Sequence, residues 1–539
     1  MTISRSTHVG VGEPLPSDRQ LEADAAPSLA AAAPPDRVAV IVAHGMGQQA
    51  HFETLEEVAE VLRAAEGRAR GVTPPITVRI VSLGGRAVPR AEVRVTAASG
   101  RPRDVHLYES YWAPLTEGTV TTAEAVWFLV GSGLRGMRQC GFLRWWFERY
   151  LFDRRIRFEF PKTTLLQFFA ALLLIGSLLA INALMVAALA SRTLAGGAGG
   201  WPSDALLADL TCDLALGLTG ILVAMLGATL LPAGHRRWSR RHAASGRASP
   251  AAAAWVTGLA WLLMFAALAS LVATALAMLG NAWHHMAAGA ARQVHVGPLD
   301  RVFEGFGGAP WTPLQWAVFL VTWLGGGIVN WQVRRFLLQY VGDVAVYVSS
   351  HTVSKFNQVR DAIQARALEV AEAVYRTPAA AGQGFAYPGV VMVGHSLGSV
   401  IAYDALNALL IQDALADHAL YVAARTRMFL TFGSPLDKTA FIYRSQRLRP
   451  TGAREALAAA KQPMILDYRW RPARWVNIHS PHDWISGSLQ YYDDPDQRDR
   501  RTQWVENLAD PDATTPLAAH VEYWRNRLLA DRLHEAVTA

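Results

Sequence analysis

Gly394, Ser396 and Gly398 follow the spacing Gly-x-Ser-x-Gly, which could support nucleophilic chemistry at the serine. An apolar run at residues 390–393 precedes the motif and predicts a buried strand, while residues 400–411 can form a helix. A chain that turns this sharply from strand to helix has little room beside the serine, so we expect the two glycines to be required. The turn would push the Ser396 hydroxyl out of the sheet, where it could attack an electrophile.

A serine hydroxyl needs a base to remove its proton, and the base needs an acid to hold its tautomer and stabilise its charge. Asp483 and Asp437 each follow a strand-like run downstream of Ser396. We favour Asp483, which comes one strand later and nearer the end of the sheet, and keep Asp437 as the alternative acid. His520 stands where a loop meets a helical region and could reach back over the sheet edge. His534 lies close to the end of the chain, so we expect it at the surface.

Backbone donors are the third requirement, because negative charge develops on the attacked carbonyl oxygen. The N–H of Leu397, directly after the serine, would supply one donor. The sequence His44-Gly45-Met46-Gly47 ends an apolar run, and Gly45 would let this loop approach an acyl group. We therefore expect the Met46 N–H to be the second donor of an oxyanion hole.

Alternating strand-like and helix-like segments must position these residues. Apolar runs predict strands at residues 38–43, 77–83, 91–96, 104–110, 427–432 and 474–479, and helical spacing predicts helices at 52–65 and 355–376. A final helical region begins near Pro516. This alternation is typical of an α/β fold with a mostly parallel sheet and helices on both faces.

Four long apolar segments interrupt this pattern, at residues 163–190, 214–234, 251–280 and 313–331. About 20 apolar residues span the hydrocarbon core of a bilayer, so each is a candidate membrane span. The fourth, which is the shortest, could instead be a buried helix.

Arginine is concentrated before the first segment, between the second and third, and after the fourth. The positive-inside rule places these three flanks in the cytoplasm. An even number of spans returns the chain to the same side, as a single domain built from both flanks requires. We expect a disordered tail at residues 1–36, the N-terminal part of the domain at 37–160, a four-helix membrane insertion at 161–332 and the C-terminal part at 333–539.

Composition agrees with a membrane protein, since 51% of residues are hydrophobic and only 18% are charged although the net charge is +7. The basic residues lie beside apolar stretches and not in an aromatic-interleaved stripe, which argues against nucleic-acid binding. Cys140 and Cys212 have no metal-ligand spacing, so neither a metal nor a disulfide framework is expected. Abundant arginine and alanine are typical of GC-rich bacterial genomes, and the expected location is a bacterial inner membrane.

Taken in order, these motifs resemble serine lipases and esterases of the α/β-hydrolase superfamily. The resemblance covers roughly residues 37–112 and 340–530, and implies Ser396 as nucleophile, Asp483 as acid and His520 as base, with no cofactor. Two features depart from the pattern. Trp484 stands where related intracellular lipases commonly have proline, and the apolar insertion replaces a short connection before the serine strand.

The sequence thus predicts a membrane-embedded serine hydrolase, with its hydrolase domain on the cytoplasmic side, that cleaves acyl esters through an acyl-enzyme intermediate. A site at the bilayer surface favours lipid substrates over soluble esters. An acyltransferase or thioesterase could use the same residues, since only the acceptor or the leaving group differs. A non-catalytic membrane protein that kept a hydrolase scaffold is the alternative from another class. Such a non-catalytic protein has no need for the serine, acid, base and glycine loop together, so their joint presence favours an enzyme.

Overall fold

The computed structural model describes a large part of the chain. The described residues are 36–47, 49–121, 123–128, 130–131, 134, 162–194, 204–242, 250–288, 312–336, 341–348, 354–379, 384–439, 472, 474–489, 492–493, 505–515 and 518–539. The tail predicted at residues 1–36 lies outside them, except for Asp36, which begins the first strand.

Eight strands form one sheet in the order β2-β3-β4-β1-β5-β6-β7-β8. Six neighbouring strands, from β4 to β8 in this order, run parallel, while β2 and β3 form an antiparallel edge. The strands are β1 (Asp36–Ala43), β2 (Ile76–Leu83), β3 (Arg86–Thr96), β4 (Pro102–Ser110), β5 (Gly389–His395), β6 (Thr426–Phe432), β7 (Trp475–His479) and β8 (Glu506–Ala509). The prediction of a mixed α/β fold with a mostly parallel sheet is confirmed.

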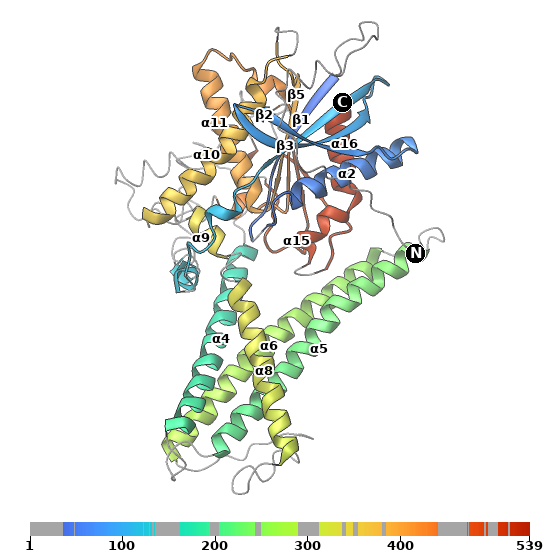
Figure 1. Ribbon diagram of the computed structural model, residues 1–539. Coiled ribbons are helices and arrows are strands. Elements are labelled where there is room, and N and C mark those ends of the chain that lie inside the picture. The colour runs from blue at the N-terminus through green and yellow to red at the C-terminus, as the bar shows by residue number, and fades with distance from the viewer. Residues whose placement is uncertain are drawn as a thin grey trace.

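Helices cover both faces of this sheet (Figure 1). On one face, α2 (Glu53–Arg70) and α16 (Arg527–Thr538) pack on Val38, Val40 and Val42 of β1. On the other, α10 (Ser354–Arg376) and α11 (Leu397–Leu415) pack on Ala39 and Ile41 of the same strand. Because β1 is buried on both faces, its sequence is a continuous apolar run without polar alternation.

The sequence did not predict β8 or the short helix α9 (Gly342–Val348). β8 has the sequence Glu-Asn-Leu-Ala and pairs only with β7, so little of it is buried and no apolar run marks it. The C-terminal region is split into α15 (Ala519–Glu522), a 3-10 turn at Tyr523–Arg525, and α16. Short elements of this kind take their stability from tertiary contacts, which a local pattern does not record.

Helices occupy all four predicted apolar segments: α4 (Lys162–Leu194), α5 (Asp204–His242), α6 (Pro250–Ala288) and α8 (Pro313–Phe336). Two stretches, Leu206–His235 and Trp255–Met286, are long and apolar enough to span a membrane. Within the described residues, the apolar helix found in α4 is shorter, at Leu172–Ala188, and α8 includes three glycines, an asparagine and two glutamines that lower its mean hydropathy. Among the described residues, two of the four predicted spans thus meet both conditions.

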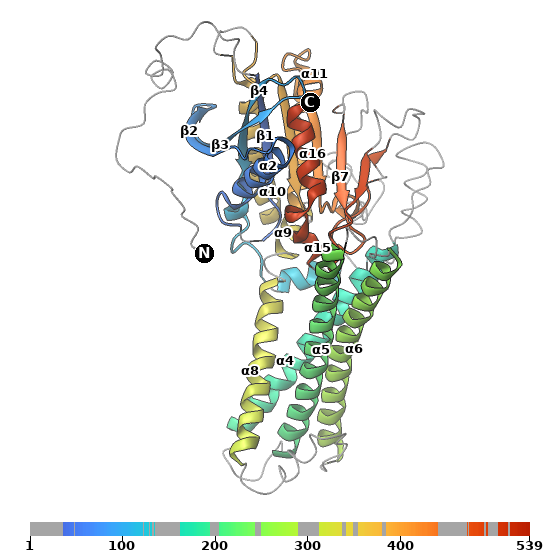
Figure 2. The ribbon, with the colours of Figure 1, turned by 90° about the vertical axis from the view of Figure 1, so that its right-hand side faces the viewer.

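The four helices form one bundle that extends away from the α/β domain (Figures 1 and 2). α5 and α6 approach most closely, because a Cβ added at Gly217 would lie 1.9 Å from Thr274 Oγ1 and one at Gly220 would lie 2.5 Å from Ser270 Oγ. Close contact at small residues is how helices associate in lipid. Asn182 of α4 also donates to Asn330 of α8 at 2.7 Å, so all four helices have partners within the bundle.

The insertion separates two strands that are neighbours in the sheet. β1 pairs with β5 in parallel, with Val38 opposite Gly389 and Ala43 opposite Gly394. β1 also pairs with β4, so the central strand joins the two halves of the chain. A single α/β domain is thus built from segments on both sides of the helical bundle.

Candidate active site

Ser396 lies at the turn between β5 and α11, with backbone angles φ 53° and ψ −130°. Positive φ is uncommon for a residue with a side chain and is maintained only where the surroundings enforce it. Gly394 and Gly398 provide the space, since a Cβ at Gly394 would lie 2.4 Å from Ser399 Cα and one at Gly398 would lie 2.2 Å from the carbonyl oxygen of Ala43. Neither position therefore has room for a side chain.

The predicted glycine loop after β1 lies directly against Ser396. A Cβ added at Gly45 would lie 3.0 Å from Ser396 Cβ and 3.0 Å from His395 Nδ1, so no larger residue fits without a shift. Met46 is buried in the adjoining core, and Leu397 is fully buried as the first residue of α11. The structure thus brings the loop that carries Met46 against Ser396, and Leu397 follows the serine as the first residue of α11.

His44 anchors this loop through its side chain. Its Nε2 accepts hydrogen bonds from the backbone N–H groups of Trp112, at 3.0 Å, and Ala113, at 3.3 Å. Nδ1 therefore carries the proton and donates to the Gly45 carbonyl at 2.8 Å. Burial lowers the pKa of His44 to about 4, in agreement with a neutral ring that accepts at Nε2.

Asp343 of α9 holds the other end of the loop. Its Oδ2 accepts the N–H of Gly47 at 2.8 Å, across 296 residues of sequence. Burial raises the pKa of Asp343 to about 6, although the Gly47 hydrogen bond opposes this shift. Sequence reasoning missed Asp343, because nothing near it in the chain marks it as a partner of the loop.

His520 and Asp483, the predicted base and acid, lie in direct contact. His520 Nδ1 lies 2.9 Å from Asp483 Oδ2, and both side chains are buried. Burial alone would raise the pKa of Asp483, but the charge of His520 and the hydrogen bonds at this carboxylate hold it well below its usual range. The carboxylate is therefore charged, and it can fix the tautomer of His520 with the proton on Nδ1.

Two further residues at this pair were not found from the sequence. Tyr523 donates its hydroxyl to Asp483 Oδ2 at 3.0 Å, and His395 Nε2 lies 3.1 Å from the backbone oxygen of His520. His395 is the residue before the candidate nucleophile, so this contact joins the serine turn to the base. The spacing of three residues between His520 and Tyr523, which places both on one side of a helical turn, was the available signal.

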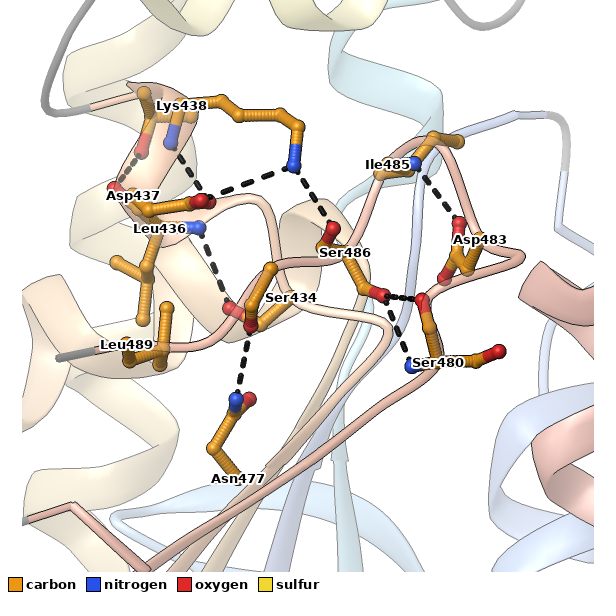
Figure 3. A network of polar contacts seen from close by, with 12 residues as sticks. Ser434, Leu436, Asp437, Lys438, Asn477, Ser480, Asp483, Ile485, Ser486 and Leu489 are labelled. Carbon is orange, nitrogen blue, oxygen red and sulfur yellow. Dashed lines mark hydrogen bonds and ion pairs between the residues drawn. The ribbon is translucent and has the colours of Figure 1, made fainter. Parts of the chain in front are cut away.

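Asp437, the alternative acid, takes another position. Its Oδ1 accepts the backbone N–H of Lys438 at 2.8 Å, and its Oδ2 lies 3.8 Å from Lys438 Nζ. Lys438 also donates to the Ser486 carbonyl at 2.8 Å, which links this loop to the one that carries Asp483 (Figure 3). Burial raises the pKa of Asp437, and the nearby lysine opposes this. Of the two predicted acids, the structure pairs Asp483 with His520 and Asp437 with Lys438.

Ser396 Oγ and His520 Nε2 are both buried, and within the described part of the chain neither has a hydrogen-bond partner. Buried polar atoms without partners cost free energy and are uncommon, so each such atom needs an explanation. Here they belong to the predicted nucleophile and to the ring nitrogen that would take its proton. His534, the other histidine considered as base, pairs with Glu66 at 2.7 Å.

The loop that carries Asp483 rests on helix α6 of the bundle. Trp484 stacks on Trp261, with ring centroids 5.1 Å apart and planes 5° apart. Trp261 also donates its indole N–H to His482 Nδ1 at 3.2 Å. The residue that departs from the hydrolase pattern, Trp484, is thus the one that joins the acid loop to the bundle.

The described residues include no group of three or more His, Cys, Asp or Glu side chains that could hold a metal ion. No family model, no curated protein and no solved structure matches this chain.

Proposed function

We propose that this chain is a membrane-anchored serine hydrolase of the α/β-hydrolase class that cleaves acyl esters, with lipids as its substrates. The observation that carries the proposal is the His520–Asp483 contact of 2.9 Å beside a serine held at positive φ in a strand-to-helix turn. Structural roles alone do not account for a strained serine, a charged buried acid and two unpartnered polar atoms in one place.

The reaction would proceed in two balanced steps. Ser396 Oγ attacks the ester carbonyl carbon and its proton passes to His520 Nε2, while the backbone N–H groups of Met46 and Leu397 stabilise the oxyanion. Collapse of the tetrahedral intermediate breaks the bond to the leaving alcohol, which takes the proton from His520. Water then attacks the acyl-enzyme, His520 again accepts and returns the proton, and the carboxylic acid leaves. Asp483 stabilises the imidazolium in both steps and stays ionised.

We further propose that all four helices cross the membrane and that the α/β domain is cytoplasmic. The contact between Trp261 and the acid loop supports this, because it lies toward the N-terminal end of α6. If α5 and α6 alone crossed, that end of α6 would lie on the side of the membrane opposite the α/β domain. Two further crossings, by α4 and α8, return it to the domain side. Arg237 is near the C-terminal end of α5, which in that topology is on the cytoplasmic side together with the N-terminal end of α6. Its charge there agrees with the positive-inside rule.

A fluorophosphonate probe tests the hydrolase proposal on the full chain purified in detergent. We expect labelling of the wild type and none of Ser396→Ala, with a loss on the order of 10³-fold or more in labelling rate for His520→Ala and Asp483→Asn. Asp437→Asn is the matched control for the acid and should be labelled at a rate close to that of the wild type.

Equal labelling of the wild type and Ser396→Ala would overturn the proposal. Loss of labelling in Asp437→Asn with a reactive Asp483→Asn would move the acid role to Asp437. Melting temperatures of all four variants establish that each is folded, so that a loss of labelling reports on chemistry.

A further inference from the structure

A pocket of about 510 Å³ lies where the glycine loop, the segment after β4 and the end of α8 meet. Its walls include Gly47 and Tyr111 from the domain and Trp331, Arg334 and Arg335 from α8. A volume of this size is typical of small-molecule sites. The pocket therefore combines the loop of the candidate oxyanion hole with the end of a bundle helix.

Charge in the pocket is mixed, because its walls carry two arginines and two carboxylates. Arg334 and Arg335 are successive residues at the C-terminal end of α8, and both are exposed. Of the two carboxylates in the walls, that of Asp343 already accepts the Gly47 N–H, which leaves Glu117 as the other. Guanidinium groups bind phosphate oxygens in planar, paired hydrogen bonds. The arginines can thus provide the binding group for a phosphate.

The position of the pocket fits the head-group region of a bilayer. Trp331 is 56% exposed one turn before the arginines, and tryptophan followed by basic residues is typical of the membrane surface at a helix end. Basic pockets at the cytoplasmic ends of membrane helices bind lipid head groups. Gly47 connects the pocket to the site, since it is two residues from Gly45, which lies against Ser396.

We propose that this pocket binds the phosphodiester head group of a glycerophospholipid and so presents one of its acyl esters to Ser396. This inference rests on the proposed function for the chemistry, but the binding of the head group does not require catalysis. In a glycerophospholipid the phosphate and the nearest acyl ester are joined by the glycerol unit alone. A head group held beside Gly47 would place that ester near the adjoining glycine loop.

Binding is measured first, in the full chain carrying Ser396→Ala so that no turnover occurs. Titration with short-chain dihexanoyl phosphatidylglycerol should give an affinity that is weakened about tenfold or more by Arg334→Gln with Arg335→Gln, because charge-assisted hydrogen bonds are lost. Arg237→Gln, an exposed arginine near the end of α5, should bind as tightly as the unmutated chain. Inorganic phosphate serves as competitor: displacement at equal concentration would indicate a free-phosphate site and overturn the lipid assignment.

Catalysis provides the second measurement, with phosphatidylglycerol, phosphatidylethanolamine and diacylglycerol of the same acyl chains. We expect the wild type to prefer both phospholipids over diacylglycerol in kcat/KM, and the double arginine variant to lose that preference about tenfold. Lysine at both positions should restore part of it. Unchanged affinity and unchanged preference in the double variant would overturn the pocket proposal. A wild type that binds the head group but cleaves no ester would overturn the hydrolase proposal alone.

Discussion

His44 joins the glycine loop to the domain by a set of hydrogen bonds that only a neutral imidazole can make. Both backbone donors, Trp112 and Ala113, point at Nε2, so a proton there would remove two acceptor contacts at once. Its ring also stacks on Trp112, with centroids 4.6 Å apart. The loop that should hold the oxyanion therefore depends on the charge of a residue that takes no part in the reaction.

This dependence gives the protein a predictable response to acid. The pKa of His44 is lowered from 6.5 to about 4 in the folded state, so the unfolded state binds the proton first as pH falls. The stabilising contribution is complete above pH 6.5 and is lost as pH falls toward 4, on the order of 3 kcal/mol in total. We expect the melting temperature to fall more steeply from pH 6.5 to 4 in the wild type than in His44→Gln, which keeps an acceptor but does not titrate. Parallel pH profiles would contradict this assignment.

At the residue scale, the sequence predicted those features of the site that depend on neighbouring residues in the chain. The serine turn needs two glycines within five residues, and the constraint that produces this spacing is steric and local. Asp343 and Trp261 could not be predicted, since each acts on the site only through a contact made by folding. The preference for Asp483 over Asp437 depended on counting strands, a topological argument that needs no contact to be known.

At the scale of elements, helix α6 and the acid loop form a joint between bundle and domain. The loop from β7 is held at Asp483 by Tyr523 and at Trp484 by Trp261. One contact comes from the C-terminal region of the domain and the other from the bundle. The orientation of the acid is thus set partly by a helix that is long and apolar enough to span a membrane.

Trp261→Ala tests this joint. Loss of the stacked ring and of the hydrogen bond to His482 should lower kcat about thirtyfold, since each of the two interactions contributes about 1 kcal/mol to ordering the loop. KM should change little, because the contact positions the acid and does not bind substrate. Trp261→Phe keeps an aromatic ring without the N–H, so its kcat should lie between those of the wild type and Trp261→Ala.

Trp255→Ala is the matched control, since Trp255 is on the same helix and is 80% exposed. Equal kcat in Trp261→Ala and Trp255→Ala would show that the joint has no influence on the site. A rise in KM without a change in kcat would instead assign Trp261 to substrate binding.

The sequence predicted the elements of the central sheet well and its margins poorly. β1 and β5 are buried on both faces, so their apolar runs at residues 38–43 and 390–393 are unbroken. The edge strand β8 has partly exposed residues on both faces. Its stability as a strand comes from pairing with β7, because its composition does not favour a strand. The four apolar helices were predicted by composition, whereas their packing depends on small residues such as Gly217 that a hydropathy pattern does not distinguish.

At the scale of the whole molecule, the number of crossings determines where each helix end lies. With four crossings, Arg237 of α5 lies on the same side as Arg101 of the domain, and Ala288 of α6 lies on the opposite side. With two crossings, by α5 and α6 alone, Arg237 and Ala288 exchange sides. We expect the first arrangement. Single cysteines at these three positions, in a chain with Cys140 and Cys212 replaced by serine, can be labelled with a membrane-impermeant maleimide in intact and opened cells.

Protection of Arg237→Cys and Arg101→Cys together in intact cells, with labelling of Ala288→Cys, is the expected pattern. Labelling of Arg237→Cys together with protection of Ala288→Cys would contradict four crossings. The contact between Trp261 and the acid loop would then need an explanation other than four membrane crossings.

The pairing of β1 with β5 also constrains the order of events during synthesis. When the ribosome has made β1 to β4, these strands can pair, but β1 is then an edge strand with unbroken apolar residues and unpaired backbone groups. Such an edge is prone to pair with other chains. The partner strand emerges only after the entire helical bundle has been translated, so in the proposed topology membrane insertion precedes closure of the sheet. A nascent chain held at the membrane during this interval is kept from diffusing to other nascent chains, and a delay in insertion should therefore appear as aggregation of the N-terminal half.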